Sequence, residues 1–143
     1  MEARASYVAA IVASAAMLAT FRTTAVACQV HVGQIVILAS QELDPDVFLW
    51  DSRDRLTRYA QGDYSVQMVL RHTILVPAYA HAVVTGCQNT AIRPPYAGSS
   101  DPAVDLVGVK VTSGTSRGRF GWVLSSDVRR PDGSPFIRQN RPD

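Results

Sequence analysis

The feature that most constrains the fold is the N-terminal segment, because it decides how much of the chain is left to fold and in which compartment. A short, weakly basic start precedes a nearly unbroken apolar run from Ala5 to Phe21. Ala25-Val26-Ala27 then forms the small-x-small pattern that a signal peptidase cleaves. The run is rich in alanine and contains hydroxyl side chains, so it is weakly apolar for a membrane span. The sequence therefore predicts a signal peptide over residues 1–27.

Two alternatives to simple cleavage stay open at this segment. A small residue directly before Cys28 is what a lipoprotein signal requires, although Ala25 stands where leucine is usual. Cys28 would then carry a lipid anchor. An uncleaved anchor or an amphipathic start is the third interpretation. With simple cleavage or with lipidation, the domain is periplasmic or secreted, and no membrane span remains after cleavage.

The two cysteines bear on how a chain of this size is stabilised. Residues 28–143 suit one small domain whose single core is marginal without reinforcement. Cys28 and Cys87 are the only cysteines, and two lone cysteines in an oxidising compartment most often pair. The chain-entropy model gives such a bridge roughly 4 kcal/mol of stabilisation. We therefore predict a Cys28–Cys87 disulfide.

Metal, cofactor and nucleic-acid sites are not indicated. The chain has no CxxC and no histidine pair at metal-ligand spacing, which argues against zinc. Asp44, Asp46 and Asp51 form a loose acidic group, but the DxDxDG spacing of a calcium loop is missing, which favours solvated loop acids. Fourteen lysine and arginine residues nearly balance twelve aspartate and glutamate residues, so no basic surface for nucleic acid is indicated. We expect no metal and no cofactor.

Catalytic motifs are also missing. The three histidines are scattered, and none lies beside a serine or cysteine in a recognisable nucleophile motif. A Cys87–His81 dyad would be too far apart along an extended strand, and a disulfide would occupy Cys87. The sequence therefore indicates a protein that is not an enzyme.

Hydrophobic patterning predicts a mainly β domain with one preceding helix. Residues 29–39 are typical of a strand, and residues 51–62 predict a helix that Asp51 caps and Gly62 ends. From residue 66 onward we expect only strands and turns, the clearest being a hairpin of residues 105–112 and 119–124. The expected divisions are a signal peptide (1–27), an N-terminal strand and helix (28–65), a small β-barrel-like domain (66–130) and a loose tail (131–143).

The block from Asp105 to Val128 resembles the end of a bacterial Src-homology-three-like barrel domain. In that family a VKV strand, a turn, a Gly-Trp-Val strand and a short helical turn follow one another. Here Val109-Lys110-Val111, Gly121-Trp122-Val123 and Ser125–Val128 stand in those places. The chain departs from the family in the long insertion at residues 88–103 and in the helix ahead of the barrel. The resemblance implies a small, partly open antiparallel barrel and a non-catalytic binding or scaffold module.

Aromatic residues are the remaining candidates for a ligand face, because rigid rings give contact area at low entropic cost. The predicted ligand-binding residues are Trp122, in the Gly-Trp-Val strand, Tyr96, in the proline-rich insertion, and Tyr79. Trp50, within an apolar run, is expected to be buried. We expect an exported, non-catalytic module whose partner is a cell-wall component or an envelope protein. Open alternatives are a small periplasmic enzyme or inhibitor with its site between helix and barrel, and a lipid-anchored subunit of an envelope assembly.

Overall fold

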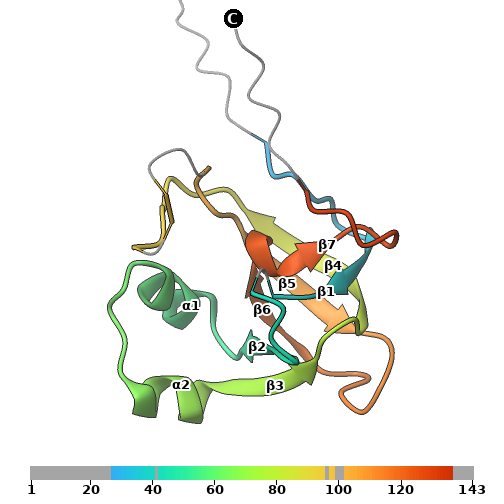
Figure 1. Cartoon of the computed structure of the whole chain (residues 1–143), viewed down its shortest axis with the longest axis horizontal. Coiled ribbons are helices and arrows are strands. Elements are labelled where there is room, and N and C mark those ends of the chain that lie inside the picture. The colour runs from blue at the N-terminus through green and yellow to red at the C-terminus, as the bar shows by residue number, and fades with distance from the viewer. Residues whose placement is uncertain (1–26, 41, 96, 99–101, 137–143) are drawn as a thin grey trace, which may run out of the picture.

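The computed structural model describes residues 27–40, 42–95, 97–98 and 102–136. In chain order its elements are β1 (Ile35–Leu38), β2 (Asp46–Trp50), α1 (Arg53–Ala60), α2 (Val66–His72), β3 (Thr73–Pro77), β4 (His81–Gln88), β5 (Leu106–Val111), β6 (Phe120–Leu124), the 3-10 turn η1 (Ser125–Asp127) and β7 (Val128–Arg129). The strands form a single curled, antiparallel sheet in the order β3-β2-β6-β5-β4-β1-β7 (Figure 1). The expected mainly β fold, a small and partly open antiparallel barrel, is confirmed.

The single sheet crosses the expected boundary between residues 28–65 and residues 66–130. β1 pairs with β4 and β7, and β2 pairs with β3 and β6, so strands from before and after residue 65 share one sheet. The start of the expected tail turns back to β7, where Arg129 forms a bridge with Pro135. The predicted signal peptide up to residue 26, Tyr96 and the tail after residue 136 lie outside the described residues.

The inner face of the sheet encloses the larger apolar cluster, here called the inner cluster. Pleated strands place successive side chains on opposite faces, so Val107 and Val109 of β5 point inward while Leu106 lies on the outer face. β-Branched side chains pack well on such a surface. The buried residues of the inner cluster are all aliphatic and come from every strand: Val30, Val36, Leu38, Val47, Leu49, Val76, Ala80, Ala82, Val84, Val107, Val109, Val111, Val123 and Val128.

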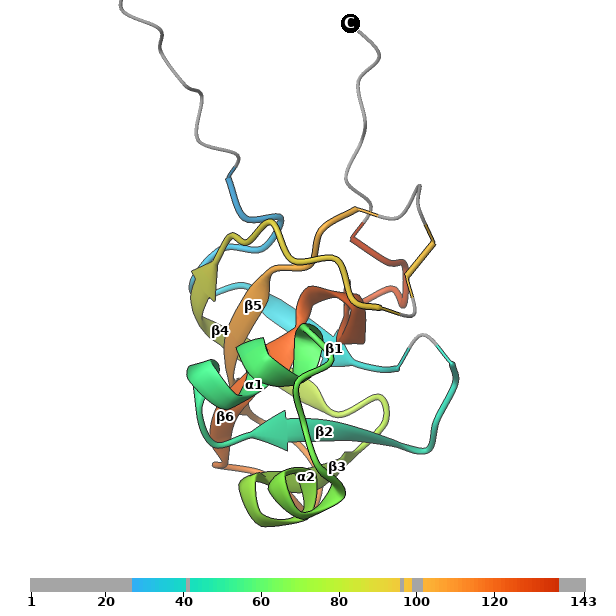
Figure 2. The same cartoon turned by 90° about the vertical axis from the view of Figure 1, so that its left-hand side faces the viewer.

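A smaller group, here called the outer cluster, lies between the opposite face of the sheet and helix α1, which runs across β5 and β6 (Figure 2). Trp50 belongs to it and is only 1% exposed, as expected. The buried residues of the outer cluster are Trp50, Leu56, Ala60, Val69, Val104, Leu106 and Leu124. Tyr59 and Trp122 pack against them while keeping part of their surface exposed. The aromatic side chains of the domain are therefore concentrated outside the barrel.

The ends of α1 explain its position in the chain. Its N-cap is Ser52, whose side chain accepts a hydrogen bond from the Arg55 N–H, so the expectation that Asp51 caps the helix is wrong. Gly62 stops the helix as predicted, with φ at +82°. Pro95 packs over this turn so closely that a Cβ on Gly62 would lie 2.9 Å from the proline ring. The insertion between β4 and β5 thus lies against the end of α1.

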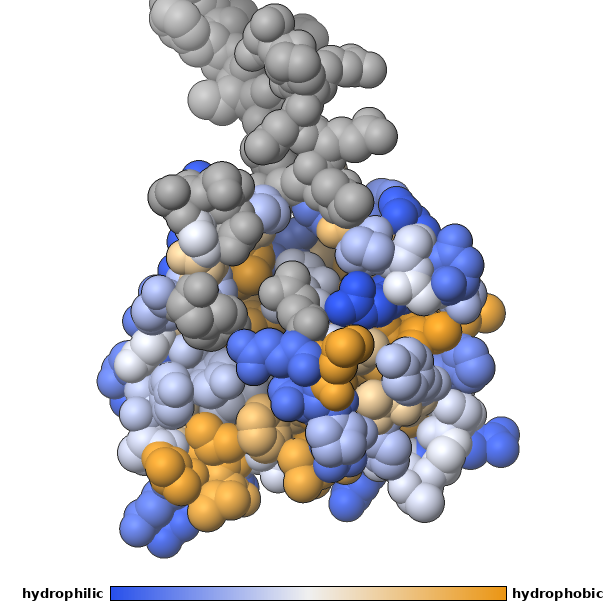
Figure 3. All heavy atoms as spheres, viewed as in Figure 1, coloured by the Kyte–Doolittle hydropathy of each residue, from blue (hydrophilic) through white to orange (hydrophobic). Residues whose placement is uncertain are grey.

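The stretch after residue 65 is not only strand and turn, which corrects the expectation of one helix. Residues Val66–His72 form α2, because Ser65 caps it by accepting a hydrogen bond from the Met68 N–H. Only Val69 of α2 is buried, and apolar side chains gather on the surface around this helix (Figure 3). The apolar residues of α2 therefore do not form one buried stripe. A search of the sequence for strand alternation or for a single helical stripe misses this helix.

β1 begins later than expected, and β2 was not expected as a separate strand. β1 starts only at Ile35, because the chain turns at Gly33, which has φ at +87° and donates its N–H to the Val84 carbonyl. The strand β2 starts at Asp46. The proline at 45 stands just before the strand, where its missing N–H removes no ladder bond.

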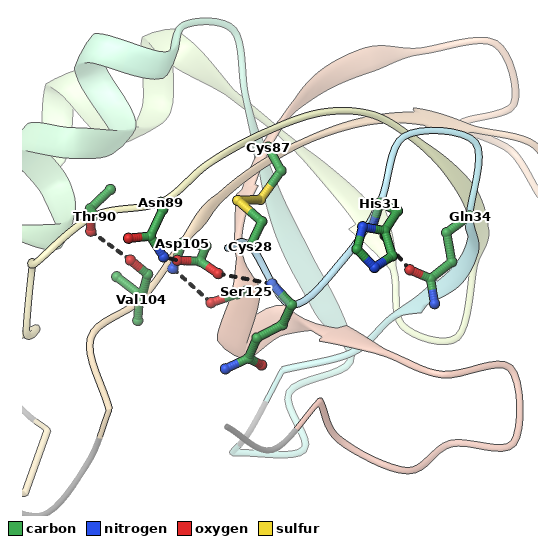
Figure 4. The surroundings of a disulfide bond; sticks show 10 residues. Cys28, His31, Gln34, Cys87, Asn89, Thr90, Val104, Asp105 and Ser125 are labelled. Atoms are coloured by element: carbon green, nitrogen blue, oxygen red, sulfur yellow. Dashed lines mark hydrogen bonds between the residues drawn. A yellow bond between two sulfur atoms is a disulfide. The ribbon is translucent and has the colours of Figure 1, made fainter. Parts of the chain in front are cut away.

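The predicted disulfide is present: Cys28 and Cys87 are joined, with their Cα atoms 6.3 Å apart (Figure 4). It ties the segment before β1 to β4. The buried Asp105 lies beside it, and its carboxylate accepts hydrogen bonds from the Asn89 side chain at 2.8 Å and the Gln29 N–H at 3.4 Å. One covalent bond and a buried carboxylate therefore hold the segment around Cys28 against the sheet.

Candidate ligand pocket

Two of the three predicted ligand-binding residues, Trp122 and Tyr79, lie apart from each other. Trp122 lies on the outer face with its ring near Gly86 and Gly108, and the Arg53 guanidinium lies 5.8 Å from its ring centroid. Tyr79 is 64% exposed in the turn between β3 and β4. Tyr96 lies outside the described residues. Trp122 pairs in register with Trp50 at one end of β2, whereas Tyr79 follows the part of β3 that pairs with the other end, so the sheet separates them.

A hollow of about 520 Å³ lies between α1, β2, η1 and described residues of the segments 40–46 and 94–104. We call it the acidic pocket, because its described lining includes four carboxylates and no basic side chain. The carboxylates are those of Glu42, Asp44, Asp46 and Asp127. Its aromatic lining residues are Phe48, Trp50, Tyr59 and Phe136. A hollow of this size with rings and a few polar groups is typical of small-ligand sites.

Aromatic rings form one wall of the acidic pocket. The rings of Trp50 and Tyr59 lie 5.0 Å apart between centroids, and Tyr64 continues the stack at 4.7 Å from Tyr59. Burial, and then the neighbouring Tyr64 and the pocket carboxylates, raise the pKa of the Tyr59 phenol. The phenol therefore stays protonated at neutral pH, and its O–H can donate a hydrogen bond to a ligand.

Among the pocket carboxyls, that of Asp127 has the most strongly shifted pKa. It lies in η1, whose position is set by a hydrogen bond from the Ala39 N–H to the Asp127 carbonyl at 2.9 Å. Burial raises the pKa of its carboxyl to about 7, Arg129 opposes this rise, and the charges of Asp44 and Glu42 reinforce it. At neutral pH this carboxyl is therefore balanced between its two protonation states, and a bound cation would favour the ionised one.

The acidic pocket does not have the geometry of a metal site. Within the described ranges, the only group of three ligand-type atoms close together is that of Cys28, Cys87 and Asp105, and both sulfurs are already bonded to each other. Asp51, grouped with Asp44 and Asp46 in the sequence, lies apart from them: its carboxylate accepts hydrogen bonds from His72 at 2.9 Å and from Arg55. The pocket carboxylates are thus spread around a hollow, an arrangement that suits an extended organic cation better than a metal ion.

Sequence reasoning missed most of the pocket. Tyr59 could be placed on the apolar stripe of α1, and Asp127 in the short turn after β6, but nothing in their spacing joins them. They come from segments 68 residues apart that only the curled sheet brings to one hollow.

No family model, curated protein or solved structure matches the chain. None of the helices in the described ranges has the length and apolar character needed to cross a membrane. The resemblance to Src-homology-three-like barrels accordingly stays a prediction from the sequence.

Proposed function

We propose that the protein is an exported, non-catalytic binding module whose acidic pocket takes a cationic amino group of a cell-wall component or an envelope protein. The observation that carries this proposal is the acidic pocket itself, in which four carboxylates and a ring wall occur without a basic side chain among the described lining residues. An ammonium group entering there would meet opposite charge on one side and aromatic faces on the other. Both contacts are attractive, and both strengthen as water is excluded.

Export is supported by the disulfide, because structural disulfides persist in oxidising compartments. The same bond favours signal cleavage over lipidation, since the Cys28 sulfur cannot hold a disulfide and a lipid thioether together. The mature protein would then begin at Cys28 in the periplasm or outside the cell. Intact mass of the protein recovered from the cell envelope should match residues 28–143 less two hydrogens. A diacylated Cys28 would overturn this part of the proposal.

The rival interpretation, a small enzyme with its site between helix and barrel, has less support. The acidic pocket does lie between α1 and the barrel, but no histidine, lysine or cysteine is among its described lining residues. Without such a group the described lining holds no histidine or lysine base beside a serine or cysteine nucleophile, and its carboxylates are the remaining groups that could act as a nucleophile or an acid. Binding without chemistry is therefore the function that this lining supports best.

A binding experiment with two kinds of probe tests the proposal. Co-sedimentation with insoluble cell-wall material reports the whole ligand, and a titration with lysine amide, followed by NMR, reports the amino group alone. Asp127→Asn and Glu42→Gln should each weaken binding about tenfold, because a charge-assisted contact is worth about 1.5–3 kcal/mol. Asp63→Asn is the matched control, since Asp63 is exposed and outside the pocket.

The pH dependence of lysine amide binding gives a second readout. Because the Asp127 carboxyl ionises near pH 7, affinity should rise severalfold between pH 6 and pH 8, and Asp127→Asn should remove most of that rise. Equal binding by the wild type, the two pocket variants and the control would refute the pocket as the site. The pocket variants could instead lose binding to wall material while lysine amide binds neither them nor the wild type. That result would refute the amino group as the recognised feature.

A further inference from the structure

A second, smaller hollow of about 180 Å³ lies where β2, β3 and β6 meet the start of α1 and the end of α2. We call it the basic groove. Its lining residues are Leu49, Asp51, Arg71, His72, Thr73, Ile74, Arg119 and Phe120. None of them lines the acidic pocket, and the proposed function uses none of them. The basic groove is therefore an independent feature.

The charge of the basic groove is net positive. Asp51 is its only carboxylate among the described lining, and it is paired with Arg55, whose Nη1 lies 3.1 and 3.2 Å from its two oxygens, and accepts a hydrogen bond from His72. Arg71 and Arg119 are exposed and form no ion pair with any described residue. Two guanidinium groups are thus left to face an anion from outside, and guanidinium groups suit phosphate oxygens because they bind them with two parallel hydrogen bonds.

Exposed apolar side chains stand around this charge. Phe120 is 64% exposed at the groove, with the Lys110 ammonium 5.1 Å from its ring centroid. Val66 and Leu70, four residues apart on α2, are 72% and 73% exposed, and Leu75 projects from β3. Figure 3 shows apolar side chains gathered over this region of the surface. Apolar side chains that project beside basic ones are typical of surfaces that enter the interface of an anionic membrane.

The edge of the sheet at this place is closed to an added peptide strand. Hydrogen bonds from the Asp51 N–H to the His72 carbonyl and from the Ala78 N–H to the Pro45 carbonyl fix the ladder, so Thr73, Leu75 and Pro77 face the free edge. The Thr73 N–H is already bonded to the Val69 carbonyl, and proline has no N–H. Only the Leu75 N–H is left to pair, which disfavours a peptide partner bound by strand addition.

We infer that the basic groove and the apolar side chains around it dock the protein on the surface of an anionic phospholipid membrane. Arg71 and Arg119 bind lipid phosphates, and Phe120, Leu70 and Val66 enter between the headgroups. This attachment is peripheral: it needs neither a membrane-spanning helix nor a lipid on Cys28. It holds the acidic pocket beside the membrane, and it is independent of what that pocket binds.

Vesicle co-sedimentation tests the inference. The probe is a vesicle of phosphatidylcholine with one quarter phosphatidylglycerol, compared with pure phosphatidylcholine, and the protein is used as recovered from cells with its N-terminus known from intact mass. The anionic vesicles should bind at least tenfold better at 50 mM salt, with most of this preference lost at 300 mM, because the contacts are electrostatic. A retained apolar N-terminus would bind both vesicles alike and leave no such preference.

Matched variants locate the surface. Arg71→Glu and Arg119→Glu should each lower binding to anionic vesicles about tenfold or more, whereas Arg130→Glu, the same charge change next to β7, should have little effect. Leu70→Ser should lower it severalfold, and Leu43→Ser, at a residue 79% exposed elsewhere, should not. Arg71→Lys, which keeps the positive charge, should keep most of the binding, and unchanged thermal unfolding of Arg71→Glu and Arg119→Glu shows that these variants fold.

Three results would overturn the inference. One is equal binding to neutral and anionic vesicles at low salt, and another is equal loss in Arg71→Glu and Arg130→Glu. The third is tight, Arg71-dependent binding to a soluble polyanion such as heparin with no binding to vesicles, which would assign the groove to an anionic polymer. Asp127→Asn should leave vesicle binding unchanged, so failure here and failure of the proposed function are told apart.

Discussion

The two faces of the sheet differ in the residues that they bury. The inner cluster contains only valine, leucine and alanine among its buried residues, whereas the outer cluster contains Trp50 and packs against Tyr59 and Trp122. Short aliphatic side chains fill a closed interior at high density, while rings leave gaps that a helix covers only in part. The acidic pocket opens on the side of the rings. The comparison supports the proposal that the inner face stabilises the barrel and the outer face binds a ligand, and substitutions on each face should separate these roles.

The largest effect is expected from the disulfide, because Cys87 packs against the inner cluster. Cys87→Ser or Cys28→Ser should lower the free energy of unfolding by about 4 kcal/mol, since the bridge closes a loop of 59 residues. Urea denaturation followed by circular dichroism measures this loss. If either variant loses less than about 1 kcal/mol, the start of the chain contributes little to the inner face.

Two glycines allow a direct test of the comparison. A Cβ on Gly121 would lie 2.5 Å from Leu49 Cγ and 2.7 Å from the Trp50 carbonyl oxygen, so Gly121→Ala should cost about 3 kcal/mol or more. A Cβ on Gly86 would meet only Trp122 at 3.5 Å, so Gly86→Ala should cost less than about 1 kcal/mol. Thermal unfolding of both variants checks the difference. Equal shifts in Tm would contradict the closer packing of the inner face.

The Asp127 carboxyl should make the outer face sensitive to pH. Its folded pKa of about 7 lies above the ordinary value of 3.8, so the folded state binds more protons between these values and stability falls as pH rises through that range. Asp127→Asn should remove this slope and stabilise the protein at pH 8.5 by on the order of 2 kcal/mol. Urea midpoints at pH 5 and pH 8.5 measure it.

Asp51 is a control for this prediction, because its pKa is shifted in the opposite direction. Its partial burial would raise its pKa, but hydrogen bonds from His72 and Arg55 hold that pKa below the ordinary value. Its contribution to stability is therefore present at neutral pH and is lost as pH falls through the folded pKa. The Asp127 prediction is contradicted if Asp127→Asn unfolds with the same loss of stability between pH 5 and pH 8.5 as the wild type. A group other than Asp127 would then cause that loss.

The smallest effect is expected from Arg53, whose guanidinium lies over the exposed side of Trp122. Arg53→Ala should cost about 0.5 kcal/mol, because an exposed cation–π contact is weak. Tryptophan fluorescence should respond more than stability does, since the surroundings of the ring change. A cost above about 2 kcal/mol would mean that Trp122 depends on Arg53 for its packing, and the outer face would then be as tightly packed as the inner one.

Local patterns predicted the parts of the fold that depend on neighbours in the chain. The hairpin of β5 and β6 follows from clean alternation and a glycine-bearing turn, and α1 from its stripe and its stop at Gly62. The helix α2 was missed, because its exposed Val66 and Leu70 give it the composition of a strand. The Ser65 cap and the burial of Val69 in the outer cluster favour the helix there over a strand.

The amino-acid sequence by itself determined a small, mainly β domain with a Cys28–Cys87 bridge, because alternation, turn residues and cysteine number act locally or through chain length. Only the tertiary structure decided where the two hollows lie and what charge each has. Glu42, Tyr59 and Asp127 meet in the acidic pocket because the sheet curls, and Arg71 and Arg119 meet in the basic groove because β3 and β6 begin at the same corner. Charges that nearly cancel over the chain are separated in space by the fold, and that separation supplies the two proposed binding surfaces.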